Sequence, residues 1–185
     1  MKEYAEDIIL EYTDTNKPVL LRIIVGQDPY PDKGKRVVIS KYPVNNIVSF
    51  WQSKNNKKDG AYQRFLTLVN ANLKPFHDIY RELQNLEHNN YYFFNYFSTI
   101  AKKGKRRKSQ KVKILEFIEK NILDKEYCYI ALIGRKARIG LKKDLIRLGI
   151  PRNNILVISH PPSNNRNAKN DWTKLSSSDK SRFQI

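Results

Sequence analysis

Four short apolar runs, rich in β-branched and aromatic residues, set the strongest limit on the fold of this chain. They are VLLRIIV (19–25), YYFFN (91–95), YCYIALIG (127–134) and NILVIS (154–159). Each run has the length of a strand, and its nearly continuous apolar character is typical of strands that are buried on both faces. The runs therefore predict the strands of one buried sheet.

Helical periodicity occupies much of the sequence between and beside these runs. Apolar residues recur at helical spacing in 62–73, 76–86, 109–123 and 135–149, and the last of these ends at a Gly-Ile-Pro stop signal. In 109–123 the apolar positions 112, 114, 115, 118 and 122 share one side of the expected helix. Strands that alternate with helices favour a parallel sheet with helices on both faces. We therefore predict an α/β fold, a single domain with a central four-stranded parallel sheet flanked by helices.

The chain length fits one domain with a sizeable core, because it has 185 residues. We predict a single domain over 1–185, with the segment 1–17 and the polar tail 174–185 peripheral, and we expect the tail to fray. No run is long and apolar enough to cross a membrane, and the acidic amphipathic start does not resemble a secretory signal. The single cysteine, Cys128, is expected to be a buried structural thiol, which fits a reducing compartment.

The charge of the chain is strongly positive, with 35 Lys and Arg against 18 Asp and Glu and a formal net charge of +17. Such a balance attracts phosphate backbones and favours salt-dependent, sequence-independent binding. The alternatives are a merely soluble basic protein and a binder of another anionic surface. The densest basic stretch, 101–113, holds eight Lys and Arg, and it is interpreted either as a solvated loop or as a phosphate-facing one.

Polar side chains, together with glycine and proline turns, follow the predicted strands. In parallel α/β sheets ligands bind beyond the carboxyl ends of the strands, so these side chains are expected to converge on one edge. Along the chain they are Gln27, Asp28 and Tyr30 after the first strand, Asn95 at the end of the second, Gly134, Arg135 and Lys136 after the third, and Ser159, His160, Pro161, Pro162 and Ser163 after the fourth.

The chemistry of this set points to a nucleobase. An amide both donates and accepts, so it can read a base edge, and a histidine can hydrogen-bond or protonate a leaving group. A carboxylate can orient water or stabilise a developing cation, and an aromatic ring can stack on a base. Each residue also has a structural alternative: Asp28 as a turn, Asn95 as a strand-end cap and His160 as a packing residue. With the basic charge, the set favours chemistry on a base that has left the stack.

Five motifs in this sequence resemble those of family 1 uracil-DNA glycosylases. GQDPYP (26–31) resembles the water-activating motif, usually GQDPYH, and SHPPS (159–163) is similar to the DNA-intercalating motif HPSPLS. YYFFN (91–95) resembles the family strand that ends in asparagine, KPFHDIYREL (74–83) the segment PPSLxNxxKEL, and ALIGRKAR (131–138) a strand that ends in Gly-Ser or Gly-Asn. The resemblance covers about residues 19–172, and the proline after DPY is closer to divergent poxviral members.

The resemblance implies a glycosylase-like fold and a set of roles. Asp28 would position water and stabilise the sugar cation, and His160 would hydrogen-bond the departing uracil. Asn95 would read the uracil edge, Tyr30 would exclude the thymine methyl group, and Gln27 would shape the water-activating loop. The implied reaction is hydrolysis of the bond between uracil and deoxyribose, with no metal or organic cofactor.

The sequence departs from the family pattern at three positions. Ile39 stands where the family stacks a phenylalanine on uracil, unless a shifted loop brings Tyr42 there. Pro75 replaces a phosphate-contacting serine, and Asn164 replaces the leucine that enters the duplex. Besides Pro75 and Asn164, we expect the following residues to contact DNA: Gly134, Arg135, Lys136, Pro161, Pro162, Ser163, Asn165 and Arg166.

These departures leave three interpretations open. The first is an active uracil-DNA glycosylase that acts on single- or double-stranded DNA. The second is a relative without catalysis that binds DNA, a replication protein or a DNA-mimicking glycosylase inhibitor. The third is another base- or nucleotide-processing α/β protein. In the first two we expect a monomer without membrane contact, inside a bacterial cytoplasm or in the compartment where a virus replicates its DNA.

Overall fold

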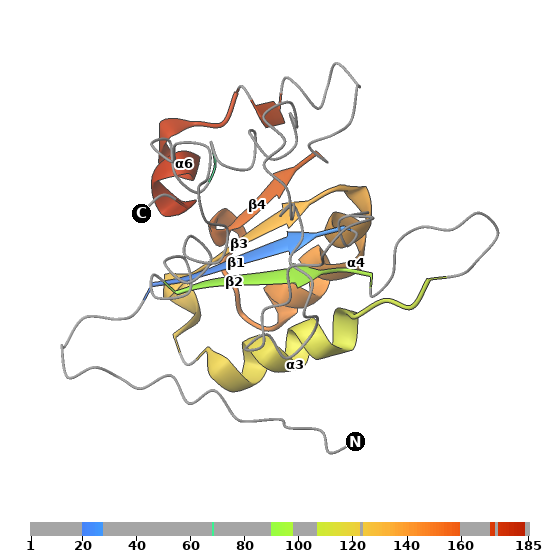
Figure 1. Ribbon diagram of the computed structural model, residues 1–185. Helices are drawn as coiled ribbons and strands as arrows, with labels where there is room; N and C mark the ends of the chain where they lie inside the picture. The colour runs from blue at the N-terminus through green and yellow to red at the C-terminus, as the bar shows by residue number, and fades with distance from the viewer. Residues whose placement is uncertain are drawn as a thin grey trace, which may run out of the picture.

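A computed structural model describes residues 20–27, 68, 90–97, 107–122, 124–159, 171–172 and 174–183. Its centre is a sheet of four parallel strands in the order β2-β1-β3-β4 (Figure 1). The strands are β1 (Leu21–Gly26), β2 (Tyr91–Asn95), β3 (Cys128–Ile133) and β4 (Ile155–Ile158). The prediction of a four-stranded parallel α/β sheet is confirmed, and each strand lies at its predicted apolar run.

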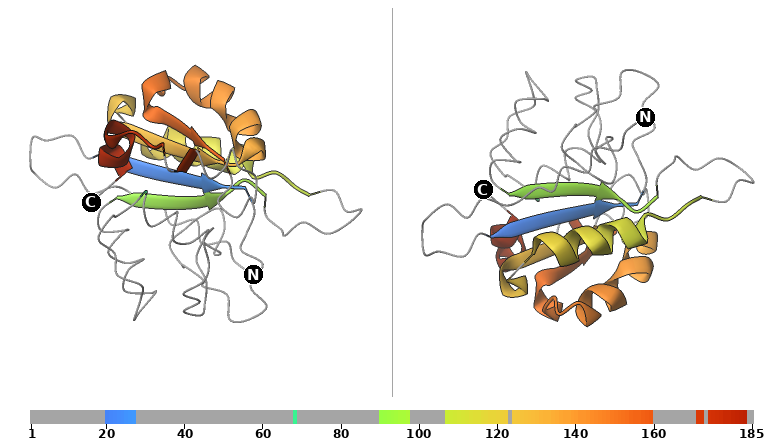
Figure 2. Two further views of the ribbon diagram at one scale, coloured as in Figure 1. Left: turned by 90° about the horizontal axis from the view of Figure 1, so that it is seen from above. Right: turned by 90° about the horizontal axis from the view of Figure 1, so that it is seen from below.

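Three α-helices accompany the sheet in the described part of the chain: α3 (Lys111–Asn121), α4 (Arg135–Arg147) and α6 (Ser177–Phe183). Two short 3-10 turns, η1 (Lys125–Tyr127) and η2 (Arg152–Asn154), lead into β3 and β4. Helices α3 and α4 lie together on one face of the sheet (Figure 2). The predicted helices at 62–73 and 76–86 lie outside the described residues, apart from residue 68.

Alternation along the strands explains why the core forms on both faces of the sheet. Ile23 of β1 and Ile130 of β3 pack in one cluster with Ile118 of α3 and Leu141 of α4. The strand residues that alternate with this cluster point to the opposite face and are buried too, namely Ile24, Phe93, Ala131 and Ile133. Strands buried on both faces read as continuous apolar runs, which is why the sequence located them.

Helix α3 begins two residues later than the sequence predicted. Ser109 pairs with Phe97 in an isolated antiparallel bridge, and Gln110 donates its backbone N–H to the Tyr96 carbonyl over 2.8 Å. These bonds extend the end of β2 and keep both residues out of the helix. The predicted apolar side is also corrected at Val112, which is 65% exposed, while Phe117 is buried in its stead.

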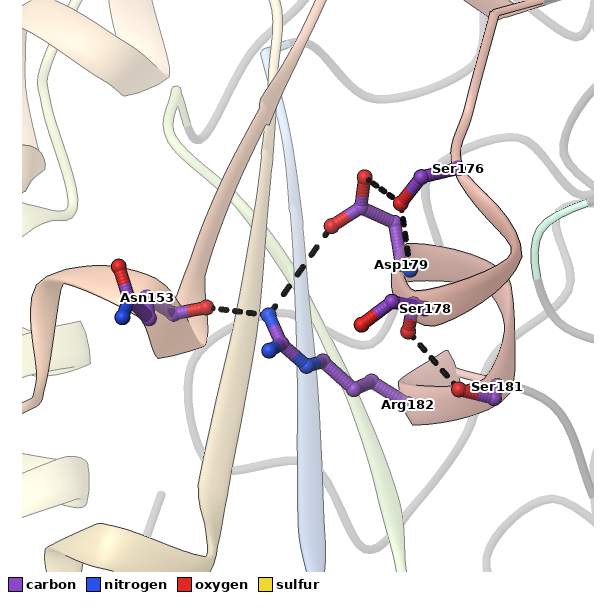
Figure 3. Close-up of polar contacts among 6 residues, drawn as sticks. All are labelled: Asn153, Ser176, Ser178, Asp179, Ser181 and Arg182. Carbon is purple, nitrogen blue, oxygen red and sulfur yellow. Dashed lines mark hydrogen bonds and ion pairs between the residues drawn. The ribbon is translucent and has the colours of Figure 1, made fainter.

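The C-terminal tail does not fray as expected but forms helix α6. Ser176 accepts the Asp179 N–H over 3.0 Å and donates to the Asp179 carboxylate over 2.6 Å, so it caps the helix (Figure 3). Arg182 donates to the Asn153 carbonyl over 2.6 Å. Phe183 is 1% exposed, and its carbonyl accepts from the Tyr91 hydroxyl. The tail is therefore attached near the amino ends of the strands.

Cys128 is buried at the start of β3, as predicted for a structural thiol. Burial raises the pKa of this thiol to about 12, so the thiolate is not formed near neutral pH. In the described part of the chain there is no group of three His, Cys, Asp or Glu side chains suited to a metal ion. None of the described helices has the length and apolar character to span a bilayer.

Candidate functional site

The carboxyl ends of all four strands lie at one edge of the sheet, because the strands are parallel. Asn95 ends β2 and lies opposite Gly26, the last residue of β1, so Asn95 and Gln27 occupy neighbouring strand ends. The main chains stay paired beyond the strands, since Tyr96 donates to Gly26 over 2.8 Å and Phe97 donates to Gln27 over 3.1 Å. The carboxyl edge therefore places an amide side chain on each of two adjacent strands.

Gln27 connects this edge to the start of α4. Its side-chain Oε1 accepts the Lys136 backbone N–H over 3.4 Å, across 109 residues of sequence. The long-range bond explains how a residue just beyond β1 is oriented. Asp28 is the next residue in the chain, but its position, like that of Tyr30 and Ile39, lies outside the described residues.

Gly134 forms the turn between β3 and α4. Its φ of 95° lies in a region that side chains with a Cβ rarely adopt, which explains why glycine stands there. Its N–H donates to the Ile158 carbonyl over 2.8 Å and ties the end of β3 to the end of β4. Arg135 and Lys136 follow at once and are exposed at the start of the helix. These three predicted residues therefore lie at the same edge as Asn95.

Asn95 is fully buried, and the segment just before α3 holds it in place. Gln110, itself 8% exposed, donates its side-chain Nε2 to the main-chain carbonyl of Asn95 over 3.4 Å and its backbone N–H to the main-chain carbonyl of Tyr96. The Arg107 guanidinium lies 3.8 Å from the centroid of the Phe97 ring. Sequence reasoning assigns no role to Gln110, because the predicted helix 109–123 includes it. The available signal is its place as a polar residue directly before an amphipathic run.

Asp171 and Trp172 hold the end of β4. The Ser159 hydroxyl donates to the Asp171 carboxylate, and the Trp172 indole donates to the Ser159 carbonyl over 2.9 Å. Trp172 is 4% exposed, so its ring is packed in the interior while its indole N–H holds the end of β4. The residues next in the chain and the other predicted DNA contact lie outside the described residues: His160, Pro161, Pro162, Ser163, Asn164, Asn165, Arg166 and Pro75.

Tyr96 packs against α4 at Gly140, where an added Cβ would overlap the tyrosine ring. Alanine normally stabilises a helix relative to glycine by about 1 kcal/mol. We nevertheless expect Gly140→Ala to lower the free energy of unfolding by about 1–2 kcal/mol, because the Tyr96 ring must move. In a Tyr96→Ala background the same change should stabilise by about 0.5–1 kcal/mol. Urea denaturation of the four proteins checks this, and a stabilising effect in both backgrounds would contradict it.

Comparison with known proteins gives no family for this chain. Neither the protein-family models nor the curated proteins produced a match.

Proposed function

We propose that this protein is a uracil-DNA glycosylase, with a fold like that family, that hydrolyses the bond between uracil and deoxyribose in a base flipped out of DNA. Asp28 positions the attacking water and stabilises the sugar cation, and His160 hydrogen-bonds the departing uracil. Asn95 reads the uracil edge, Tyr30 excludes the thymine methyl group, and Gln27 orients the loop that carries Asp28. These roles rest on the motifs of the sequence.

One structural observation supports the proposal most. The strand ends that lead into the proposed chemistry are each held by a long-range contact: Gln27 by the Lys136 N–H, Asn95 by Gln110, and Ser159 by Trp172. Reaction of a buried base needs groups fixed in place before the substrate arrives. Asp28 and His160 follow Gln27 and Ser159 directly in the sequence, so both begin from an anchored backbone.

The place of Asn95 supports its role in base recognition. Asn95 ends β2 at the carboxyl edge, and a base with the wrong edge would leave its amide without partners in the closed site. Hydrogen-bonding sites of this kind reject a wrong substrate far more strongly than apolar pockets do. The net charge of +17 supports attraction of the DNA backbone.

A second function is favoured by the departures at Ile39, Pro75 and Asn164. Loss of an aromatic stacking partner costs roughly 1–3 kcal/mol per base, and an asparagine is a poorer replacement for a flipped base than an apolar wedge. The chain would then be a catalytically impaired relative that binds DNA, a replication protein or a DNA-mimicking inhibitor. Binding without base release distinguishes this function from the first.

The experiment that tests the proposal compares three oligonucleotides that carry a single uracil, thymine or cytosine at one position. The expected result is an abasic site, detected as alkaline strand cleavage, with uracil alone. Equal cleavage at all three bases would contradict the proposed roles of Tyr30 and Asn95 in selecting uracil. DNA binding without any cleavage would favour the second function.

A further inference from the structure

Helix α4 carries a cationic face, defined as Arg135, Lys136, Arg138, Lys142 and Lys143. The helix is held on the sheet by Ala137, Leu141 and Leu145, which are all buried. Four of the five cations are exposed, and Lys142 is half-buried. Five positive charges thus lie on the sides of the helix turned away from the core.

The acidic residue of α4 does not balance this face. Asp144 pairs with Lys111 of α3 over 2.6 Å and with Arg147 over 3.2 Å, and these cations keep the pKa of its carboxyl below the ordinary value. Within the described part of the chain, none of the five cations of the face lies at ion-pair distance from a carboxylate. Their charge is therefore available to a partner.

Helix stability gives no reason for this arrangement. The first turn of α4 contains no acidic residue, and it begins with Arg135 and Lys136. Cations at the amino end oppose the helix macrodipole and cost about 0.3–1 kcal/mol each when exposed. A run of cations that does not help its own helix is better explained by an external anion.

The direction of α4 indicates where that anion lies. The helix begins at the carboxyl edge of the sheet, beside Gln27, and runs back along the outside of the sheet (Figure 2). Lys136 and Lys143 are separated by two turns, which is about 10 Å along the axis. A chain of phosphates that leaves the edge can therefore meet several cations in succession.

The apolar content of the face favours a polyanion over an acidic protein. Ile139 is 61% exposed among the cations, and the other exposed aliphatic residue in the described ranges, Val112, belongs to α3. Protein interfaces depend on a central cluster of buried apolar anchors, whereas phosphate binding depends on charge alone. Single exposed apolar residues are common on protein surfaces.

We propose that the cationic face of α4 binds the phosphate backbone of a nucleic acid that extends beyond the carboxyl edge of the sheet. The inference rests on the proposed function for the identity of the ligand. The motifs place DNA contacts at the edge, and the inference adds Arg138, Lys142 and Lys143 of α4 to them. The bound nucleic acid is then longer than the nucleotides at the site.

The test measures the affinity of the full chain for a uracil-free DNA duplex between about 50 and about 200 mM salt. The variant is Arg138→Gln/Lys142→Gln/Lys143→Gln. Its matched control is Lys120→Gln/Lys125→Gln/Arg152→Gln, which removes the same charge from the end of α3, η1 and η2, near the amino ends of the strands. Glutamine has nearly the helix propensity of lysine and arginine, so α4 should remain folded, which its melting temperature verifies.

The α4 variant should lower the slope of log affinity against log salt by about 2–3, since each lost duplex phosphate contact contributes about 0.9. Over this salt range the wild type would then lose roughly 40-fold more affinity than the α4 variant loses. The control should change the slope by less than about 1. Equal slopes for the two variants, or an α4 variant with the wild-type slope, would overturn the inference. Because this DNA lacks uracil, its binding is measured apart from catalysis. Wild type that binds it but releases no uracil from the uracil-containing oligonucleotides would refute the proposed function alone.

Discussion

Asp28→Asn is expected to slow uracil release by about 10²- to 10⁴-fold, which is the largest effect on activity that the proposed mechanism predicts. Asparagine keeps the size of the side chain but removes the charge that orients water and stabilises the sugar cation. DNA binding should be unchanged or slightly tighter, because a negative charge beside the phosphates is lost. Single-turnover release and equilibrium binding, measured on the same oligonucleotide, check both parts.

The contrast between the two measurements is what makes this variant informative. A variant in which binding and release decline together would indicate a damaged binding surface and would count against a catalytic Asp28. Release at the wild-type rate would show that the carboxylate has no part in the reaction. Lys113→Gln is a suitable control, because Lys113 is an exposed residue of α3.

Phe94→Ala is expected to have the largest effect on stability. Phe94 is 1% exposed, and its ring centroid lies 5.0 Å from that of Phe117 in α3. Removing a buried phenylalanine typically costs about 3–5 kcal/mol, which corresponds to roughly 6–20 °C in melting temperature for a domain of this size. Because Phe94 directly precedes Asn95, uracil release should also decline under conditions in which the variant stays folded.

Urea denaturation measures this loss, with Val112→Ala as the control. Val112 is 65% exposed, so its truncation should change the free energy of unfolding by less than about 0.5 kcal/mol. Similar losses for the two variants would contradict the packing of β2 against α3.

The strands could be predicted because burial on both faces leaves a plain pattern in the sequence. Tyr91–Asn95 was predicted at its observed bounds, and the stop at Gly149 is explained by a φ of 92°. Helix α6 could not be predicted in the same way. Its segment is mostly polar, and it is held by Phe183, whose carbonyl contacts Tyr91 across 92 residues. A contact between such distant residues leaves no periodic pattern.

In the candidate site, too, some features could be predicted from the sequence and others could not. Asn95, Gly134 and Lys136 could be placed at one edge because parallel strands bring their carboxyl ends together. The contacts that hold the edge could not be foreseen, since Gln110, Asp171 and Trp172 act through hydrogen bonds that depend on the tertiary structure. Gln110 shows the physical reason: its bond to the end of β2 outweighed the helical preference of its own segment.

The central claim is that this chain releases uracil from DNA, and direct identification of the released base tests it best. Wild-type protein is incubated at low salt with a single-stranded and a duplex oligonucleotide that each contain one uracil, and both the free base and the abasic strand are quantified. The proposed function predicts free uracil and abasic sites in equal amounts from at least one of the two substrates. Intact uracil-containing strands that remain bound to the protein would contradict it and turn attention to a binding role.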